Sequence, residues 1–233
     1  MTCATVIGTN IYAGTRENGI IIFPISNIYD YQFFAPAGPE RNSVFSVNAQ
    51  TENLWLTFGG FSSDYNPYAY MDVGLSKFGI SKFSNNQWTT IPYQELLGAR
   101  SLSRIIVHPT NKNLLYVSSY IDGLLKIEND VAVQLYDNVN TGSNGLQSLT
   151  PVQKDIRVLG TAFDKAGNLW LNNARVNKAF KVLKLNNQWV SYNVENIFSV
   201  PFELVYNDVV IDRADVKWFA TYGGLVAFDD KTN

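Results

Sequence analysis

The sequence has few of the residues that carry metal or nucleophile chemistry. Among its 233 residues are one cysteine, Cys3, and one histidine, His108. A single cysteine excludes an internal disulfide, and one cysteine with one distant histidine supplies neither a Cys/His nucleophile pair nor a tetrahedral zinc set. His108 stands at the turn after an apolar run, where a histidine is more often structural than catalytic. We therefore expect no metal, no cofactor and no catalytic residue.

Charge of either sign is also scarce, with 18 basic side chains against 20 acidic ones. The lysines of the expected strands stand singly and are predicted to face water; they are Lys77, Lys82, Lys126, Lys181 and Lys184. Isolated charges of this kind make no nucleic-acid footprint. The scattered aspartates form no calcium loop, and no glycine-rich phosphate loop is present. We therefore expect no nucleic-acid partner.

Long apolar runs and a leader are lacking as well. No segment approaches the roughly 20 apolar residues that cross a bilayer. The first residues, 1–6, lack a basic segment followed by an apolar stretch, which an export signal would need. The sequence thus predicts neither a transmembrane segment nor a visible signal peptide.

What the sequence does contain is a recurring aromatic strand. The aromatic residues that mark the copies are Tyr12, Trp55, Tyr116, Trp170 and Trp218. They recur at intervals of about 40 to 60 residues, which with insertions is the spacing of propeller blades. An apolar run precedes each aromatic strand, and a third strand follows it, at 74–78 in the second copy.

Turn residues separate these strands. Asn85-Asn86 and Asn186-Asn187 each precede Gln-Trp, and paired asparagines tolerate the positive φ that closes a hairpin between strands three and four. Asp164 and Asp212 stand at the same place in their repeats, before Trp170 and Trp218. This recurrence favours turn capping by the carboxylates over catalysis, which needs one asymmetric site.

Four antiparallel strands joined by hairpins cannot bury both faces alone, but sheets stacked around an axis cover one another. The sequence therefore predicts an all-β propeller of four-stranded antiparallel blades, with the recurring aromatics packed between blades. About five repeats are visible, and we expect residues 1–233 to form one domain with repeats near 5–34, 43–92, 104–136, 156–193 and 205–233. Either the two ends complete one blade between them, or the chain is a fragment of a longer propeller, which we favour.

Two loops between second and third strands contain candidate contact residues. The insertion in the second copy carries Tyr65, Tyr68 and Tyr70, which are amphipathic side chains typical of surfaces that recognise sugars and proteins. The alternative is that these tyrosines only cover the edge of a blade. In the fourth copy, Arg175 and Lys178 are suited to an anionic group, or are simply solvated cations.

The combination of Asn-Leu-Trp-Leu with a Gly-Leu-x-x-Phe strand resembles the regulator-propeller repeats of Bacteroidota surface and sensor proteins. Within that group, the runs 116–127, 136–147 and 162–173 are similar to the PorZ-like propellers of the type IX secretion system. The resemblance covers nearly the whole chain.

This resemblance implies a non-enzymatic binding module at the cell surface or in the periplasm. PorZ-like proteins belong to an attachment complex in which a sortase joins secreted cargo to anionic lipopolysaccharide. The implied partners are proteins of that complex and lipopolysaccharide or another glycan. The alternative is the ligand-sensing propeller of a hybrid two-component histidine kinase. A propeller lyase or hydrolase is a third possibility, and it would need His108 as a base.

Overall fold

The computed structural model describes residues 3–15, 19–35, 37–59, 75–150, 154–197, 206–221 and 223–231. Apart from a short 3-10 helix, η1 (Tyr93–Glu95), the elements of this part are strands in five antiparallel sheets. The first two sheets contain β1 (Cys3–Ile7), β2 (Asn10–Gly14), β3 (Ile20–Pro24) and β4 (Gln32–Phe34), then β5 (Ser46–Ala49), β6 (Asn53–Thr57), β7 (Ile80–Ser84) and β8 (Gln87–Ile91). The third contains β9 (Leu102–His108), β10 (Asn111–Ser119), β11 (Gly123–Glu128) and β12 (Val131–Tyr136). The last two contain β13 (Val158–Phe163), β14 (Leu169–Asn173), β15 (Phe180–Leu183) and β16 (Trp189–Tyr192), then β17 (Tyr206–Ile211), β18 (Lys217–Thr221) and β19 (Gly224–Phe228).

Every sheet is a simple meander in which strands adjacent in the chain are hydrogen-bonded neighbours. Connections from the first strand to the second and from the third to the fourth, most of them short turns, lie at one end of each sheet, which we term the hairpin end. The connections between second and third strands and between successive sheets lie at the opposite end, termed the loop end. The predicted all-β propeller with antiparallel blades is confirmed, and the last sheet has three strands within the described residues.

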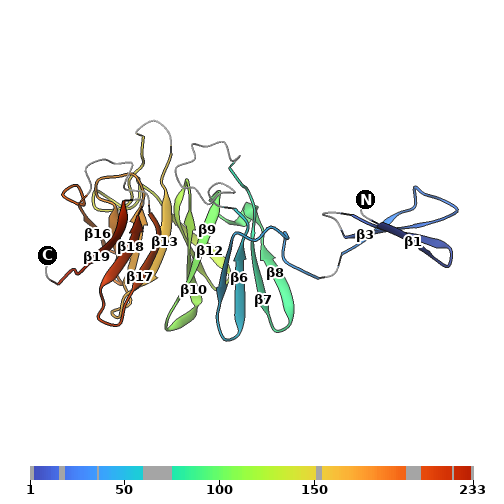
Figure 1. Ribbon diagram of the computed structural model, residues 1–233, viewed down its shortest axis with the longest axis horizontal. Helices are drawn as coiled ribbons and strands as arrows, with labels where there is room; N and C mark the ends of the chain where they lie inside the picture. Colours follow the sequence, from blue (N-terminus) through green and yellow to red (C-terminus); the bar gives the residue numbers. More distant parts are fainter. Residues whose placement is uncertain are drawn as a thin grey trace.

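Four of the five sheets stand side by side, and the sheet β1–β4 lies apart from them (Figure 1). The first strands of the four sheets face the same region. Arg104 of β9 forms an ion pair of 3.3 Å, Nε to Oδ1, with Asp208 of β17, although the β13 sheet stands between these two sheets in sequence. Asn48 of β5 also donates to the carbonyl of Ile105 at 3.1 Å. The inner strands therefore surround a common axis, as they do in propellers.

Neighbouring sheets are held together by apolar faces. Phe180 of β15 stacks on Phe219 of β18 with ring centroids 3.6 Å apart and planes 6° apart. On the opposite face of the same sheet, Leu169 and Leu171 pack in a cluster with Tyr116 of β10. A blade in the middle of the row is therefore buried on both faces, which explains why β14 and β15 are buried along their whole length.

The recurring aromatics do not all have the same surroundings. Trp55 and Trp170 are each 1% exposed, and Tyr116 is 7% exposed, all three in clusters that join one sheet to the next. Tyr12 and Trp218 are only half-buried. Tyr12 belongs to the sheet that stands apart, and Trp218 lies on the face of β18 opposite to Phe219. Burial of the aromatic thus depends on a neighbouring sheet against its own face.

The aspartates that precede two of these tryptophans cap their turns, as the sequence predicted. Asp164 accepts the backbone N–H of Asn168 at 2.8 Å, the Asn168 side-chain amide at 2.9 Å and the indole N–H of Trp170 at 2.9 Å. Asp212 accepts the indole N–H of Trp218 at 3.0 Å. Trp55 has no such partner, since its Nε1 is buried without a hydrogen bond within the described residues.

The expected hairpins also form, but one predicted strand is wrong. Asn85 and Asn86 adopt φ of 50° and 62° in the turn between β7 and β8, and Asn187 adopts 63° in the turn before β16. The third strand of the second sheet is Ile80–Ser84, whereas the sequence predicted 74–78. The reason is that the two-residue turn fixes the register, with Phe83 opposite Trp88, so the strand must end directly before Asn85.

Removing the cap should show how much the fourth sheet depends on its first hairpin. In Asp164→Ala, the N–H of Trp170 loses its acceptor in a buried position, so we expect the free energy of unfolding to fall by about 2 to 3 kcal/mol. Asp164→Asn keeps an acceptor oxygen without the charge and should lose less. Urea unfolding followed by tryptophan fluorescence measures both, and equal stability of wild type and Asp164→Ala would contradict the capping role.

Candidate functional site

The sequence placed its candidate contact residues in loops between second and third strands, which open at the loop end. Tyr65, Tyr68 and Tyr70 lie outside the described residues, so their contribution stays a prediction. Arg175 and Lys178 belong to the described connection between β14 and β15, residues 174–179. Both side chains are half-exposed, and this connection forms the centre of the candidate site.

The connection 174–179 is fixed at both ends by backbone hydrogen bonds. The N–H of Ala174 donates to the carbonyl of Arg157 at 2.8 Å, and the N–H of Asn173 donates to the carbonyl of Ala179 at 2.8 Å. Ala174 and Ala179 are fully buried. Arg175 adopts the left-handed conformation with φ of 62°, which is uncommon for a residue other than glycine. The two cations are therefore carried by a tightly held turn.

A buried arginine lies beneath this turn. Arg157, 1% exposed, donates from Nε to Asp155 at 2.8 Å and from Nη2 to the other carboxylate oxygen at 3.0 Å. Its Nη1 donates to the hydroxyl of Tyr120 at 2.9 Å. Burial alone would lower the pKa of Arg157, but the hydrogen bond with Asp155 raises it, so the guanidinium stays charged. The resulting pair is rigid and nearly neutral overall.

A second ion pair at the loop end holds the neighbouring sheet. Arg100 donates from Nε and Nη2 to the two carboxylate oxygens of Asp122 at 2.9 and 2.8 Å, and its backbone N–H donates to Asp122 at 2.9 Å. The hydroxyl of Ser119 donates to the carbonyl of Arg100 at 2.6 Å and accepts the N–H of Asp122 at 2.8 Å. These contacts fix the connection from β10 to β11 beside Tyr120.

Lys181 is the residue that the sequence placed wrongly. It was predicted to face water, but its side chain is fully buried in β15. Its Nζ donates to Oε1 of Gln147 at 3.0 Å, and Gln147 lies in the connection from β12 to β13. Burial, together with repulsion from Lys178, lowers the pKa of Lys181 from 10.5 to about 7. The reason for the error is that β15 has a neighbour on both faces, so no face of the strand is left for water.

Gln147 also lines an open hollow of about 380 Å³ at the loop end, with Asn138 and Ser143. Two carboxylates of this region, Asp155 and Asp122, are paired with arginines, and a third, Glu195, accepts the side-chain amide of Asn177 within the turn. Within the described residues no ion pair involves Lys178. The turn 174–179 therefore places two cations beside one carboxylate on a hydrogen-bonded support, and Lys178 suits a carboxylate or phosphate group.

Sequence reasoning missed Arg157, Tyr120 and Gln147, since none of them belongs to a recurring motif. The local Asp-Ile-Arg spacing of 155–157 is the one signal that could have suggested an ion pair. Across the described ranges, no group of three or more His, Cys, Asp or Glu side chains is placed to hold a metal ion. No helix of the described part is long and apolar enough to span a membrane.

His108 lies at the hairpin end, away from this site. Its ring packs edge-on against Phe163 with centroids 4.8 Å apart, and its Nδ1 accepts the N–H of Thr110 at 3.3 Å. These contacts account for its position at the end of β9.

The buried amine predicts an unusual dependence of stability on pH. Because the pKa of Lys181 is about 7 in the folded chain and near 10.5 when unfolded, the unfolded chain binds more protons between these values, and stability rises with pH across this window. Lys181→Met should be more stable at pH 6 and should lose this rise. Unfolding free energies from pH 6 to 9.5 test this, with exposed Lys184→Met as the control. An unchanged slope in Lys181→Met would show that the amine is not desolvated.

Comparison with known proteins places the fold. No protein-family profile matches the sequence, and no curated protein matches it. Among solved structures, PorZ, an essential surface component of the type IX secretion system of Porphyromonas gingivalis, superposes with a TM-score of 0.71 at 17% identity, over 96% of this chain and 30% of that one. The extracellular domain of a one-component system from B. thetaiotaomicron superposes with a TM-score of 0.54 at 17% identity, over 99% of this chain and 26% of that one. Virginiamycin B lyase from Staphylococcus aureus superposes with a TM-score of 0.55 at 10% identity, over 99% of this chain and 67% of the lyase. This chain therefore spans less than a third of the first two proteins, and the resemblance to PorZ-like and regulator propellers is confirmed at the level of the fold.

Proposed function

We propose that this chain is part of a non-enzymatic binding propeller of the bacterial surface or periplasm, which acts in type IX secretion and binds an anionic glycan such as lipopolysaccharide. The observation that carries the proposal is the superposition on PorZ across 96% of the chain with a TM-score of 0.71, against 0.54 and 0.55 for the sensor and the lyase. PorZ is a surface component of the type IX secretion system.

The chemistry of the loop end supports a glycan that carries negative charge. Arg175 and Lys178 project from a turn whose ends are hydrogen-bonded, so little side-chain support must be reorganised when a ligand binds. Arg157 and Asp155 fix the sheet beneath the turn. A phosphorylated or carboxylated sugar would pair with the two cations, while the sugar rings would contact the protein surface beside them.

The second candidate is a sensor propeller that recognises an oligosaccharide. The superposition on the extracellular domain from B. thetaiotaomicron over 99% of the chain favours it. The two functions differ in the ligand they imply. A sensor of neutral oligosaccharides would bind without dependence on salt, whereas binding of anionic lipopolysaccharide would weaken as salt screens the charges.

A lyase is the less favoured candidate. The lyase-like structures cover the chain at similar scores, but His108 is engaged with Phe163 and Thr110 at the hairpin end. If the chain were such an enzyme with His108 as its base, His108→Ala would abolish turnover. We expect that neither the wild-type chain nor the His108→Ala variant turns over quinupristin, the molecule bound in the lyase structure.

Neutralising the two cations of the turn tests the proposal directly. Arg175→Ala with Lys178→Ala should weaken binding of anionic lipopolysaccharide from a Bacteroidota outer membrane by about tenfold, since exposed ion pairs contribute up to about 1 kcal/mol each. Surface plasmon resonance at low and high salt measures the affinity. The matched control is Lys112→Ala with Lys184→Ala, which removes the same charge at the hairpin end and should have little effect.

Two outcomes would contradict the assignment. An equal loss of affinity in both double variants would show that lipopolysaccharide binding depends only on the overall charge of the protein. Retention of a neutral oligosaccharide in place of lipopolysaccharide, unaffected by salt, would favour the sensor.

A further inference from the structure

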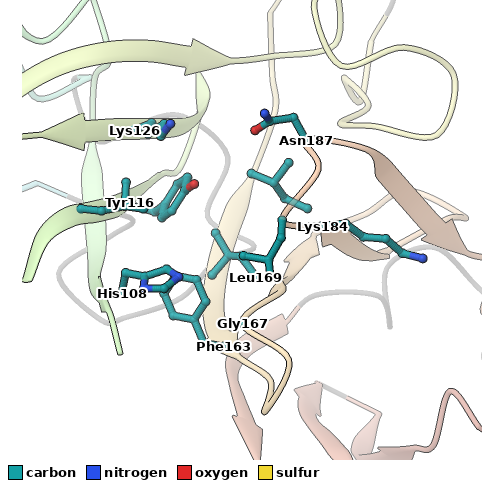
Figure 2. A pocket seen from close by; sticks show the side chains of 11 residues that line it. His108, Tyr116, Lys126, Phe163, Gly167, Leu169, Lys184 and Asn187 are labelled. Carbon is teal, nitrogen blue, oxygen red and sulfur yellow. The ribbon is translucent and has the colours of Figure 1, made fainter. Parts of the chain in front are cut away.

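A cavity of about 180 Å³ lies at the hairpin end, between the sheet β9–β12 and the sheet β13–β16 (Figure 2). Its walls come from both sheets. Leu114 and Tyr116 belong to the first of these sheets, and Phe163, Leu169 and Leu183 to the second. It is separate from Arg175 and Lys178, which lie at the loop end.

The hydroxyl of Tyr116 is a polar group that a ligand in this cavity can reach. The side chain is 7% exposed, and its hydroxyl makes no hydrogen bond with any residue of the described part. The hydroxyl is not among the buried, unpaired polar atoms of the described residues, so it opens onto the cavity that Tyr116 lines. Figure 2 shows the Tyr116 hydroxyl directed into the space between the two sheets. Burial raises the pKa of Tyr116, so the group remains a hydrogen-bond donor.

A further donor and a polar amide lie on the same side of the cavity as this hydroxyl in the view of Figure 2. The donor is Lys126, and the amide is that of Asn187, which turns its side-chain oxygen toward Tyr116, while Lys184 extends away. Lys126 pairs with Glu128 at 2.6 Å, Nζ to Oε1, which leaves its other two N–H groups. Asn187 is fixed by its turn, in which its N–H donates to the carbonyl of Lys184 at 2.9 Å. One side of the cavity thus offers donors, and the other side is apolar.

We propose that this inter-sheet cavity binds a small aromatic carboxylate. The ring would lie against Phe163 and Leu169, and the carboxylate would accept hydrogen bonds from the Tyr116 hydroxyl and from Lys126. The volume suits a single ring, since an apolar cavity of about 150 Å³ holds benzene in another protein. This inference does not depend on the proposed function.

Other small ligands fit the two sides less well. A hydrocarbon ring would leave the two donors without an acceptor. Phosphate would satisfy the donors but leave the leucine and phenylalanine wall against water. A singly charged group on an aromatic ring satisfies both sides.

The test uses the 233-residue chain and three probes, with isothermal titration calorimetry and amide chemical shifts as readouts. Benzoate carries both ring and carboxylate, benzyl alcohol lacks the charge, and acetate lacks the ring. We expect benzoate to bind at least about fivefold more tightly than either, because a charged hydrogen bond and the apolar contact each contribute. Chemical-shift changes should centre on β10, β13 and the turn at Asn187.

Variants then separate the site from general effects. Tyr116→Phe should weaken benzoate about tenfold and change benzyl alcohol less than twofold, since the lost hydrogen bond is made to a charged group. Its melting temperature should not fall, because the hydroxyl has no protein partner to lose. Tyr192→Phe, in β16 and in the cluster on the opposite face of the sheet β13–β16, is the matched control and should leave the affinity for benzoate unchanged.

Several results would overturn the proposal. These are no binding of benzoate at about 10 mM, which is weaker than about 3 kcal/mol of affinity, equal binding of acetate and benzoate, or equal affinity of wild type and Tyr116→Phe. An equal loss in Tyr192→Phe would also overturn it.

Discussion

Packing of one sheet against the next is the interaction on which this structure depends. A four-stranded meander has two faces and cannot cover both by itself. In the row of four sheets, rings such as Phe180 and Phe219 stack across the boundary, and Trp170 and Phe228 join the same cluster. Where a sheet lacks a neighbour, the same residue types remain exposed, as Phe33 and Phe34 do in the sheet that stands apart.

Close packing of the sheets also decides which polar side chains need a hydrogen-bonding or charged partner. Because the sheets exclude water, each buried charge at the loop end needs a partner. Arg157 has Asp155 and Arg100 has Asp122, both through two hydrogen bonds to the carboxylate. Lys181 has only the neutral amide of Gln147, and its pKa falls accordingly. The paired arginines support the turn 174–179, whose two cations are half-exposed.

The two ends of the sheets are therefore suited to different ligands. The loop end has the longer connections and carries Arg175 and Lys178, and it is the proposed place for an anionic glycan. At the hairpin end the turns are short, and a gap remains between two sheets where Tyr116, Phe163 and Asn187 meet. That gap suits a molecule no larger than one substituted ring. The two proposed sites thus lie at opposite ends of the same sheets.

Local spacing in the sequence determined the strands, the asparagine turns at Asn85-Asn86 and Asn187, and the aspartate caps at Asp164 and Asp212, because these depend on residues close together in the chain. It also gave the wrong third strand in the second sheet, where the turn register overrode the apolar run at 74–78. Only the tertiary structure decided which faces are covered. Lys181 is buried and Trp218 is not, although the pattern suggested the reverse, since burial depends on the sheet that stands opposite. The cavity beside His108 and the pairing of Arg157 with Tyr120 join distant segments, which no local pattern records.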